Sequence, residues 1–238
     1  MPYDDVTVSG GDVLPLIVDL IQKNPGRKVF LEHEVKGLLG EMGLHVPEGI
    51  FIGREGPWPG TARLRYPLVV KVSSGKIVSK SDVHGVRTEV PDEKTLRGVV
   101  DELMRIDGAE GVLIEEMAPQ GVEVIVGGVM DAQFGPVMMF GLGGIFVELF
   151  KDVSFGLAPL SHDEALRLVK EVKGYRLLEG YRGRPRVDVE ELAGIIITVS
   201  RLMATGLVEE VDLNPIALYP DGTLVLDAKM SVFLSQKP

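Results

Sequence analysis

The strongest local pattern lies near the carboxyl end, where residues 211–232 read VDLNPIALYPDGTLVLDAKMSV. Two runs of alternating apolar and polar residues flank Pro220-Asp221-Gly222, which is typical of a β-hairpin. A two-residue turn at Asp221-Gly222 makes Asn214 and Asp227 diagonal neighbours across the two strands. The sequence therefore predicts that these two polar side chains lie close together.

One face of this hairpin is polar. Alternation at period two places on it Asp212, Asn214, Asp227 and Lys229, with Asn214 directly opposite Lys229. Oxygen ligands with few carboxylates suit Mg²⁺, which keeps several waters and takes its remaining ligands from substrate phosphates. The same pattern is typical of the solvated face of an edge hairpin, so the spacing alone leaves both interpretations open.

The rest of the chain mixes strands and helices without strict βαβ alternation, which favours an α+β fold of two lobes. Apolar runs predict strands near residues 49–52, 68–72, 86–90, 112–114, 122–127, 136–140 and 145–150. Apolar stripes and caps predict helices near residues 14–21, 31–42, 92–104, 162–172 and 189–203. We expect one lobe over residues 1–112, with a leading helix, and a second over 113–238 that carries the hairpin.

Composition excludes several classes of protein. The 238 residues are 45% hydrophobic, enough for a sizeable core, and the net charge of −10 argues against a nucleic-acid coat. The absence of cysteine excludes disulfides, cysteine-ligated metals and cysteine nucleophiles. No apolar run approaches a membrane span, and the acidic start Met1–Asp5 does not resemble a secretory signal. We expect a soluble cytoplasmic protein that binds neither nucleic acid nor membrane.

The familiar nucleotide-binding motifs of P-loop and Rossmann proteins are absent from this sequence. Lys71 lies within the apolar strand Leu68–Val72, where an ammonium group is costly unless it meets an anion. It could also be an edge-strand lysine that reaches solvent. The small, polar and basic loop over residues 73–86 could cradle phosphate oxygens with its backbone N–H groups, or be an ordinary connection.

Further polar and glycine-rich positions follow these. Glu115-Glu116 end a strand and Glu123 lies on the next, where carboxylates can accept hydrogen bonds from ribose hydroxyls or be a solvated strand end. Gly141–Gly144 would allow close approach to a ligand or merely a tight turn, and Glu148 follows. His84, in the basic loop, could accept a phosphoryl group or be a plain loop residue.

Taken in order, these pieces resemble one family. The order is a strand lysine, a basic loop, a Glu-Glu pair, a strand glutamate, a glycine-rich turn, and Asp-x-Asn-Pro with a downstream Asp-Ala-Lys. It is similar to the ATP-grasp domain of ADP-forming acyl-CoA synthetases, specifically the β subunit of ADP-forming acetyl-CoA synthetase, and more distantly to the succinyl-CoA synthetase β subunit. The likeness covers about Leu31 to Val232, and its most specific stretches are 134–148, 151–155, 173–185 and 210–215.

This resemblance implies an ATP-grasp fold whose two lobes clasp a nucleotide. It implies ATP or ADP contacts for Lys71, Ser79, Glu115, Glu116, Met117 and Glu123, and Mg²⁺ ligands in Asn214 and Asp227. Asp212 stands where the family has an acidic residue close to a phosphohistidine. Glu148 would lie near the phosphate end, and His84 is a further catalytic candidate.

The implied reaction is acyl-CoA + ADP + phosphate ⇌ carboxylic acid + CoA + ATP. A partner α subunit would supply the CoA-binding domain and the phosphohistidine, in an α2β2 assembly. The basic loop departs from the family, because Ser79 replaces its usual histidine and His84 a usual glycine. Either His84 relays the phosphoryl group or the partner's histidine reaches ADP directly. A non-catalytic ATP-grasp module is the alternative function, and the sequence discloses neither the acid nor a preference for ADP over GDP.

Overall fold

The computed structural model describes residues 12–58, 60–61, 63–77, 79–144, 150–181 and 185–234. The chain divides into two compact units, which we call the large and the small unit. The large unit comprises Met1–Lys28, Val35–Val46 and Gln120–Pro238, and the small unit Val29–Glu34 and Pro47–Pro119. Within the described residues, none of the helices is both long and apolar enough to cross a lipid bilayer.

The small unit is built on an antiparallel sheet of four strands in the order β1-β4-β2-β3. These strands are β1 (Gly49–Gly53), β4 (Gly111–Glu116), β2 (Leu68–Ser73) and β3 (Val86–Val90). Helix α3 (Glu93–Leu103) begins at Asp92, whose side chain accepts a hydrogen bond from Thr95 N, and its buried Leu96 and Leu103 complete the core. The strand over residues 112–114 and the helix over 92–104 are thereby confirmed.

The division into these two units differs from the expected one, which placed the boundary between residues 112 and 113. That boundary would cut β4, which pairs with both β1 and β2 and therefore belongs to the small unit's sheet. The leading helix α1 (Val13–Lys23) belongs instead to the large unit. Helix α2 (Glu32–Glu41) starts in the small unit and continues in the large one. Strand pairing and helix packing, which composition does not show, decide this division.

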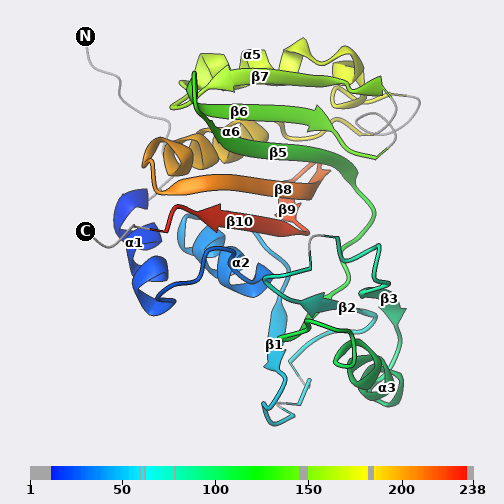
Figure 1. Cartoon of the computed structure of the whole chain (residues 1–238). Coiled ribbons are helices and arrows are strands. Elements are labelled where there is room, and N and C mark those ends of the chain that lie inside the picture. Colours follow the sequence, from blue (N-terminus) through cyan, green and yellow to red (C-terminus); the bar gives the residue numbers. More distant parts are fainter. Residues whose placement is uncertain are drawn as a thin grey trace. The chain divides into compact units, whose positions relative to one another are not determined.

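The large unit contains a sheet in the order β10-β8-β5-β6-β7, with β9 paired to β8 (Figure 1). The strands are β5 (Val122–Asp131), β6 (Gly135–Leu142), β7 (Val153–Leu157), β8 (Val208–Tyr219), β9 (Gly222–Val225) and β10 (Ala228–Val232). Helices α5 (His162–Glu171) and α6 (Val189–Ala204) cover one face, and a short 3-10 helix, η1 (Lys173–Leu177), follows α5.

Local signals in the sequence explain the ends of these helices. Ser161 and Glu164 form the expected capping box of α5, and Asp188 caps α6 through Glu191 N. The covered face of the sheet is closely packed, because a Cβ on Gly128 would lie only 2.6 Å from Met203 Cγ. Strand β7 was not expected from the sequence, and most of the expected strand 145–150 lies outside the described residues.

The carboxyl-terminal hairpin is present, but its register differs from the expected one. Tyr219 pairs with Gly222, so the turn is Pro220-Asp221 rather than Asp221-Gly222. Consequently Lys229 faces Asp212 and not Asn214. Moving the turn by one residue shifts the partner of every position by two, so each side chain keeps its face while its neighbours change.

Candidate active site

Lys71 is buried on β2, an inner strand of the small unit's sheet, so the alternative of a solvent-exposed edge lysine is wrong. Its Nζ lies 2.7 Å from Glu32 Oε1 and 2.8 Å from Glu115 Oε2. The expectation that this ammonium meets an anion is therefore confirmed, although the anions here are carboxylates. Glu115, one of the expected nucleotide residues, is thus brought into direct contact with Lys71.

A second lysine joins this cluster. Lys80, in the basic loop, places its Nζ 2.9 Å from Glu32 Oε2, so Glu32 bridges two ammonium groups. The side chain of Glu32 is only 2% exposed. Sequence reasoning missed Glu32, although a charged residue on the apolar face of the helix over residues 31–42 is a signal that could have identified it. We call Glu32, Lys71, Lys80 and Glu115 the charge cluster.

The basic loop itself follows a tight path around this cluster. Gly85 N donates to Lys80 O at 2.7 Å, and a Cβ on Gly85 would lie 2.3 Å from Val72 Cγ1, so only glycine fits there. Ser79 Oγ accepts a hydrogen bond from Asp82 N. His84 is exposed and adopts a φ of 50°. Ser79 thus serves in a local turn, and His84 lies on the loop surface.

Glu116 and Met117 follow Glu115 at the end of β4. Arg65 donates to both carboxylate oxygens of Glu116, with Nη2 at 2.7 Å from Oε2. These hydrogen bonds hold the pKa of the Glu116 carboxyl below its ordinary value. Met117 has an exposed side chain, and its N donates to Pro67 O. This strand end is therefore fixed by Arg65, which sequence reasoning did not identify.

In the large unit, Asn214 and Asp227 are direct cross-strand neighbours. Asn214 N donates to Asp227 O at 3.1 Å, so the two residues are closer than the expected diagonal arrangement would have made them. Their neighbours Leu213 and Ala228 are fully buried, which turns Asn214 and Asp227 to the opposite, accessible face. The structure therefore brings this pair together.

The donor set of this pair fits Mg²⁺. An amide oxygen and a carboxylate supply hard oxygen ligands and leave most of the octahedron to water and phosphate oxygens. In the described residues, no group of three or more His, Asp or Glu side chains could hold a metal ion by itself. A cation here would therefore need ligands from a bound phosphate, as Mg²⁺ commonly has.

Asp212 lies two residues before Asn214 on β8, directly opposite Lys229 of β10. Glu123 lies on β5 and pairs with Ala217, beyond Asn214 along β8. The backbone of Glu123 accepts a hydrogen bond from Gly143 N at 2.7 Å, and a Cβ on Gly143 would lie 2.9 Å from Glu123 Cβ. Glycine is thus required for this close approach. Glu148 lies outside the described residues.

Lys36 is a further polar residue that sequence reasoning missed. It is buried on α2, and its Nζ donates to Leu226 O at 2.8 Å. Leu226 directly precedes Asp227, at the interruption between β9 and β10. The lysine therefore holds the backbone next to one member of the polar pair.

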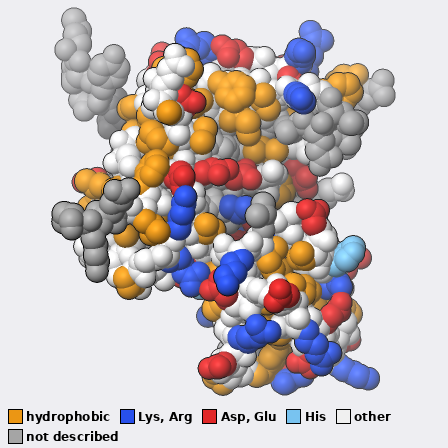
Figure 2. Space-filling model, viewed as in Figure 1, with side chains coloured by type: hydrophobic (Ala, Val, Ile, Leu, Met, Phe, Trp, Pro, Cys, Tyr) orange, Lys and Arg blue, Asp and Glu red, His pale blue; other side chains and the backbone are white. Residues whose placement is uncertain are grey.

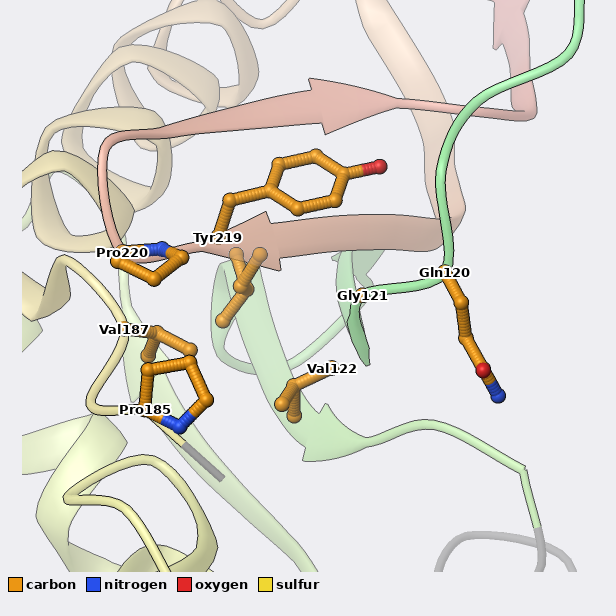
Figure 3. A pocket seen from close by; sticks show the side chains of 8 residues that line it. Gln120, Gly121, Val122, Pro185, Val187, Tyr219 and Pro220 are labelled. Atoms are coloured by element: carbon orange, nitrogen blue, oxygen red, sulfur yellow. The ribbon is translucent and has the colours of Figure 1, made fainter. Parts of the chain in front are cut away.

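A pocket of about 180 Å³ lies where β5 begins and β8 ends (Figure 3). Its lining residues are Gln120, Gly121, Val122, Pro185, Val187, Leu218, Tyr219 and Pro220. Burial, and then the nearby Glu123 carboxylate, raise the pKa of the Tyr219 hydroxyl. Most of the lining is apolar, and none of the expected site residues belongs to it.

Comparisons with known proteins identify the family of this chain. Residues 22–232 match the model of the ATP-grasp domain. An ADP-forming acetate–CoA ligase II of Archaeoglobus fulgidus is 44% identical over 205 residues, which are 86% of this chain and 30% of that protein. The β subunit of ADP-forming acetate–CoA ligase I of Pyrococcus furiosus is 40% identical over 210 residues, which are 84% of this chain and 90% of that subunit.

A solved relative shares the same fold. It is acetyl-coenzyme A synthetase 1 of Ca. Korarchaeum cryptofilum, in complex with coenzyme A and Ca-AMPCP, and it is 39% identical to this chain. The match has a TM-score of 0.83 and covers 91% of this chain and 98% of that one. Another structure of that protein contains Mg-AMPPCP and a phosphohistidine segment that points towards the nucleotide binding site.

The chain therefore belongs to the ATP-grasp domain family, and the expected α+β fold is confirmed. Within that family it belongs with the β subunits of ADP-forming acetate–CoA ligases. It spans about 30% of the length of the Archaeoglobus fulgidus ligase and 90% of the separate Pyrococcus furiosus subunit.

Proposed function

We propose that this chain is the nucleotide-binding β subunit of an ADP-forming acyl-CoA synthetase and transfers a phosphoryl group between a partner's phosphohistidine and ADP. The observation that carries the proposal is the accessible polar face of β8. Asn214 and Asp212 lie on this strand, and Asp227, just before β10, is the cross-strand neighbour of Asn214. Family membership supplies the reaction: acyl-CoA + ADP + phosphate give the acid, CoA and ATP.

In the direction of ATP formation, the N–P bond of the phosphohistidine breaks and an O–P bond forms to the terminal oxygen of ADP. Lys71 would bind the phosphates and neutralise their charge, and Asp212 would lie beside the partner's histidine. Asn214 and Asp227 would hold Mg²⁺, which when bound neutralises charge on the phosphate oxygens. Glu148 would lie near the phosphate end.

Positions around β4 and β5 would select the nucleoside. We propose that Glu115, Glu116 and Met117 surround the adenine and ribose, that Glu123 binds the ribose and that Ser79 lies beside the phosphates. The end of β4, where Arg65 binds Glu116, supports this assignment, because a strand end held in place can position backbone groups against a base. The choice between ADP and GDP stays open.

The partner would be an α subunit with a CoA-binding domain and the phosphohistidine, in an α2β2 assembly that works in the cytoplasm. The relatives support the need for a partner, since the matched region is a separate subunit in one and 30% of the chain in another. The carboxylic acid would be selected largely by that partner.

Two routes are open for the phosphoryl group, and one variant separates them. Ser79 stands where the family has a histidine, and a serine hydroxyl cannot form a phosphohistidine. If His84 relays the group, His84→Asn abolishes ATP formation. If the partner's histidine reaches ADP directly, His84→Asn retains it, and rapid-quench detection of phosphate on the β subunit stays negative.

The decisive experiment mixes this chain with its cognate α subunit, acetyl-CoA, ADP, phosphate and Mg²⁺, and measures ATP. We expect ATP formation that falls at least about 100-fold in Asn214→Ala and in Asp227→Ala. Asp221→Ala, at the exposed hairpin turn, is the matched control and should retain activity. Tight nucleotide binding without turnover would instead favour the non-catalytic module, for which the replaced loop histidine at Ser79 is the supporting feature.

A further inference from the structure

Helices α5 and α6 cover one face of the large unit's sheet, and no described residue forms a helix over the strands β5, β6 and β7 on the other face (Figure 1). The strand pairings show which side chains that other face displays. Residues paired directly across strands point to the same face. One row across the sheet consists of Lys229, Asp212, Gly127, Met139 and Phe155. The next row on the same face consists of Ser231, Glu210, Val129, Val137 and Leu157. Polar side chains thus occupy β10 and β8, and apolar ones occupy β5, β6 and β7.

The apolar half of this face is accessible. Phe155 is 61% exposed, Leu157 57% and Val129 48%, and Val137 and Met139 are partly exposed. Figure 2 shows apolar side chains gathered over β6 and β7, above a band of acidic ones over β8. On the opposite face Ser154 Oγ donates to Leu168 O of α5, so helices cover that side. We call Val129, Val137, Met139, Phe155 and Leu157 the apolar face.

We propose that the apolar face is the docking surface for the subunit that carries the phosphohistidine. This inference rests on the proposed function. Asp212, assigned to the neighbourhood of that histidine, is in the same row as Met139 and Phe155, which lie two and three strands away. At about 4.8 Å per strand, Phe155 lies roughly 14 Å from Asp212. When a partner brings its histidine to Asp212, the part of the partner that surrounds this histidine therefore lies over the apolar face.

Two observations favour this occupant over a second copy of the chain. The apolar face is continuous with the polar row that the proposed reaction uses, and a second copy would bring no phosphohistidine to it. In the Archaeoglobus fulgidus ligase the matched region is 30% of the chain, so in that protein the ATP-grasp region works beside a much larger remainder. An apolar centre beside a charged border is also typical of specific protein interfaces.

The test measures the dissociation constant between this chain and the separately purified histidine-bearing subunit encoded in the same genome. We expect the double variant Phe155→Ser, Leu157→Ser to weaken the complex at least about 100-fold, because large apolar side chains at an interface centre carry much of the affinity. The affinity of this double variant for Mg-ADP, measured without the partner subunit, should stay within twofold of the wild-type value. The matched control is Phe233→Ser, Leu234→Ser, which removes an equally apolar exposed pair (46% and 50% exposed) outside the apolar face.

A second measurement does not depend on disruptive variants. The chain has no cysteine, so Leu157→Cys and Phe233→Cys each introduce a single thiol. We expect the partner subunit to slow maleimide labelling at position 157 at least tenfold and to leave position 233 unaffected. A double variant that binds the partner as wild type does, or equal labelling at position 157 with and without partner, overturns the inference.

The controls separate this inference from the proposed function. If the wild-type mixture forms ATP and the double variant binds the partner as wild type does, only the proposed docking surface is refuted. A wild-type mixture that forms no ATP refutes the proposed function. If concentration-dependent self-association of the chain alone is lost in the double variant, a second copy occupies the apolar face and the inference fails.

Discussion

At the scale of single residues, the charge cluster is the least expected feature of the small unit. Two lysines and two glutamates lie together where little water reaches them, and their formal charges cancel. Burying charges is costly, and removing one member of a buried pair typically costs about 3–5 kcal/mol, because the remaining charge loses its partner. Glu32 contacts both ammonium groups, so its loss removes the partner of each of them.

We therefore expect Glu32→Gln to lower the free energy of unfolding by about 3 kcal/mol, measured by urea denaturation. Glu41→Gln, at the exposed end of the same helix, is the matched control and should change it by less than about 0.5 kcal/mol. Equal effects of the two substitutions would show that the bridge between Lys71 and Lys80 contributes no stability.

At the scale of elements, helix caps and the hairpin interruption decide local order. α3 begins at Asp92, whose carboxylate accepts a hydrogen bond from Thr95 N at 2.8 Å. The backbone hydrogen bond to Thr95 is the main cause that holds the pKa of Asp92 below its ordinary 3.8. The hairpin is interrupted between β9 and β10, where Lys36 of α2 holds the Leu226 carbonyl beside Asp227.

The depressed pKa of Asp92 gives a prediction of acid sensitivity. The unfolded chain binds this proton more readily than the folded one, so the stabilisation is fully present above about pH 5 and is lost as pH falls through the lowered folded pKa. We expect Asp92→Asn to flatten the fall in melting temperature between pH 5 and pH 3. Asp101→Asn, on the exposed side of the same helix, should leave the wild-type profile, and identical profiles for both variants would contradict the role of the cap.

Lys36 gives a second prediction at this scale. Lys36→Met removes the donor to the Leu226 carbonyl and leaves that backbone less well held, at a typical cost of about 1–3 kcal/mol. We expect Mg²⁺-dependent ADP binding, measured by calorimetry, to weaken about tenfold, while ADP binding in EDTA stays unchanged. Lys23→Met, on the exposed part of α1, is the control. Equal losses with and without Mg²⁺ would show that Lys36 does not act through Asp227.

At the scale of the whole molecule, the proposed nucleotide residues belong to both units. Lys71 and Glu115 lie in the small unit, and Glu123, Asn214 and Asp227 in the large one. A ligand that binds only the folded state stabilises it by about 2.7 kcal/mol at a concentration of 100 times its dissociation constant. The thermal response to Mg-ADP therefore tests whether residues of both units act on one ligand.

We expect Mg-ADP to raise the melting temperature of the wild-type chain by several degrees. Lys71→Met and Asn214→Ala should each remove most of this rise, although they change different units. Asp221→Ala should retain it. A full response in either Lys71→Met or Asn214→Ala would mean that the residue changed is not part of the nucleotide site.

The sequence by itself determined most of the elements, because their signals are local. Helical apolar stripes, the capping box at Ser161 and the alternation in the hairpin depend only on neighbouring residues. The resemblance to ADP-forming synthetases, carried by long stretches such as 134–148, likewise needed no coordinates, and the family is confirmed. The sequence singled out Lys71 as an ammonium in an apolar strand, and the structure decided between an anionic partner and solvent.

Tertiary structure alone decided which residues meet across long sequence separations. Glu32 contacts Lys71 from 39 positions away, and Lys36 contacts Leu226 from 190 positions away. The register of the hairpin differs from the expected one, because more than one two-residue turn suits Pro220-Asp221-Gly222. Local sequence does not choose among these turns, whereas the pairing of β8 with the rest of the sheet does. Burial, pairing and the apolar face depend on how strands assemble side by side, and no local pattern encodes that assembly.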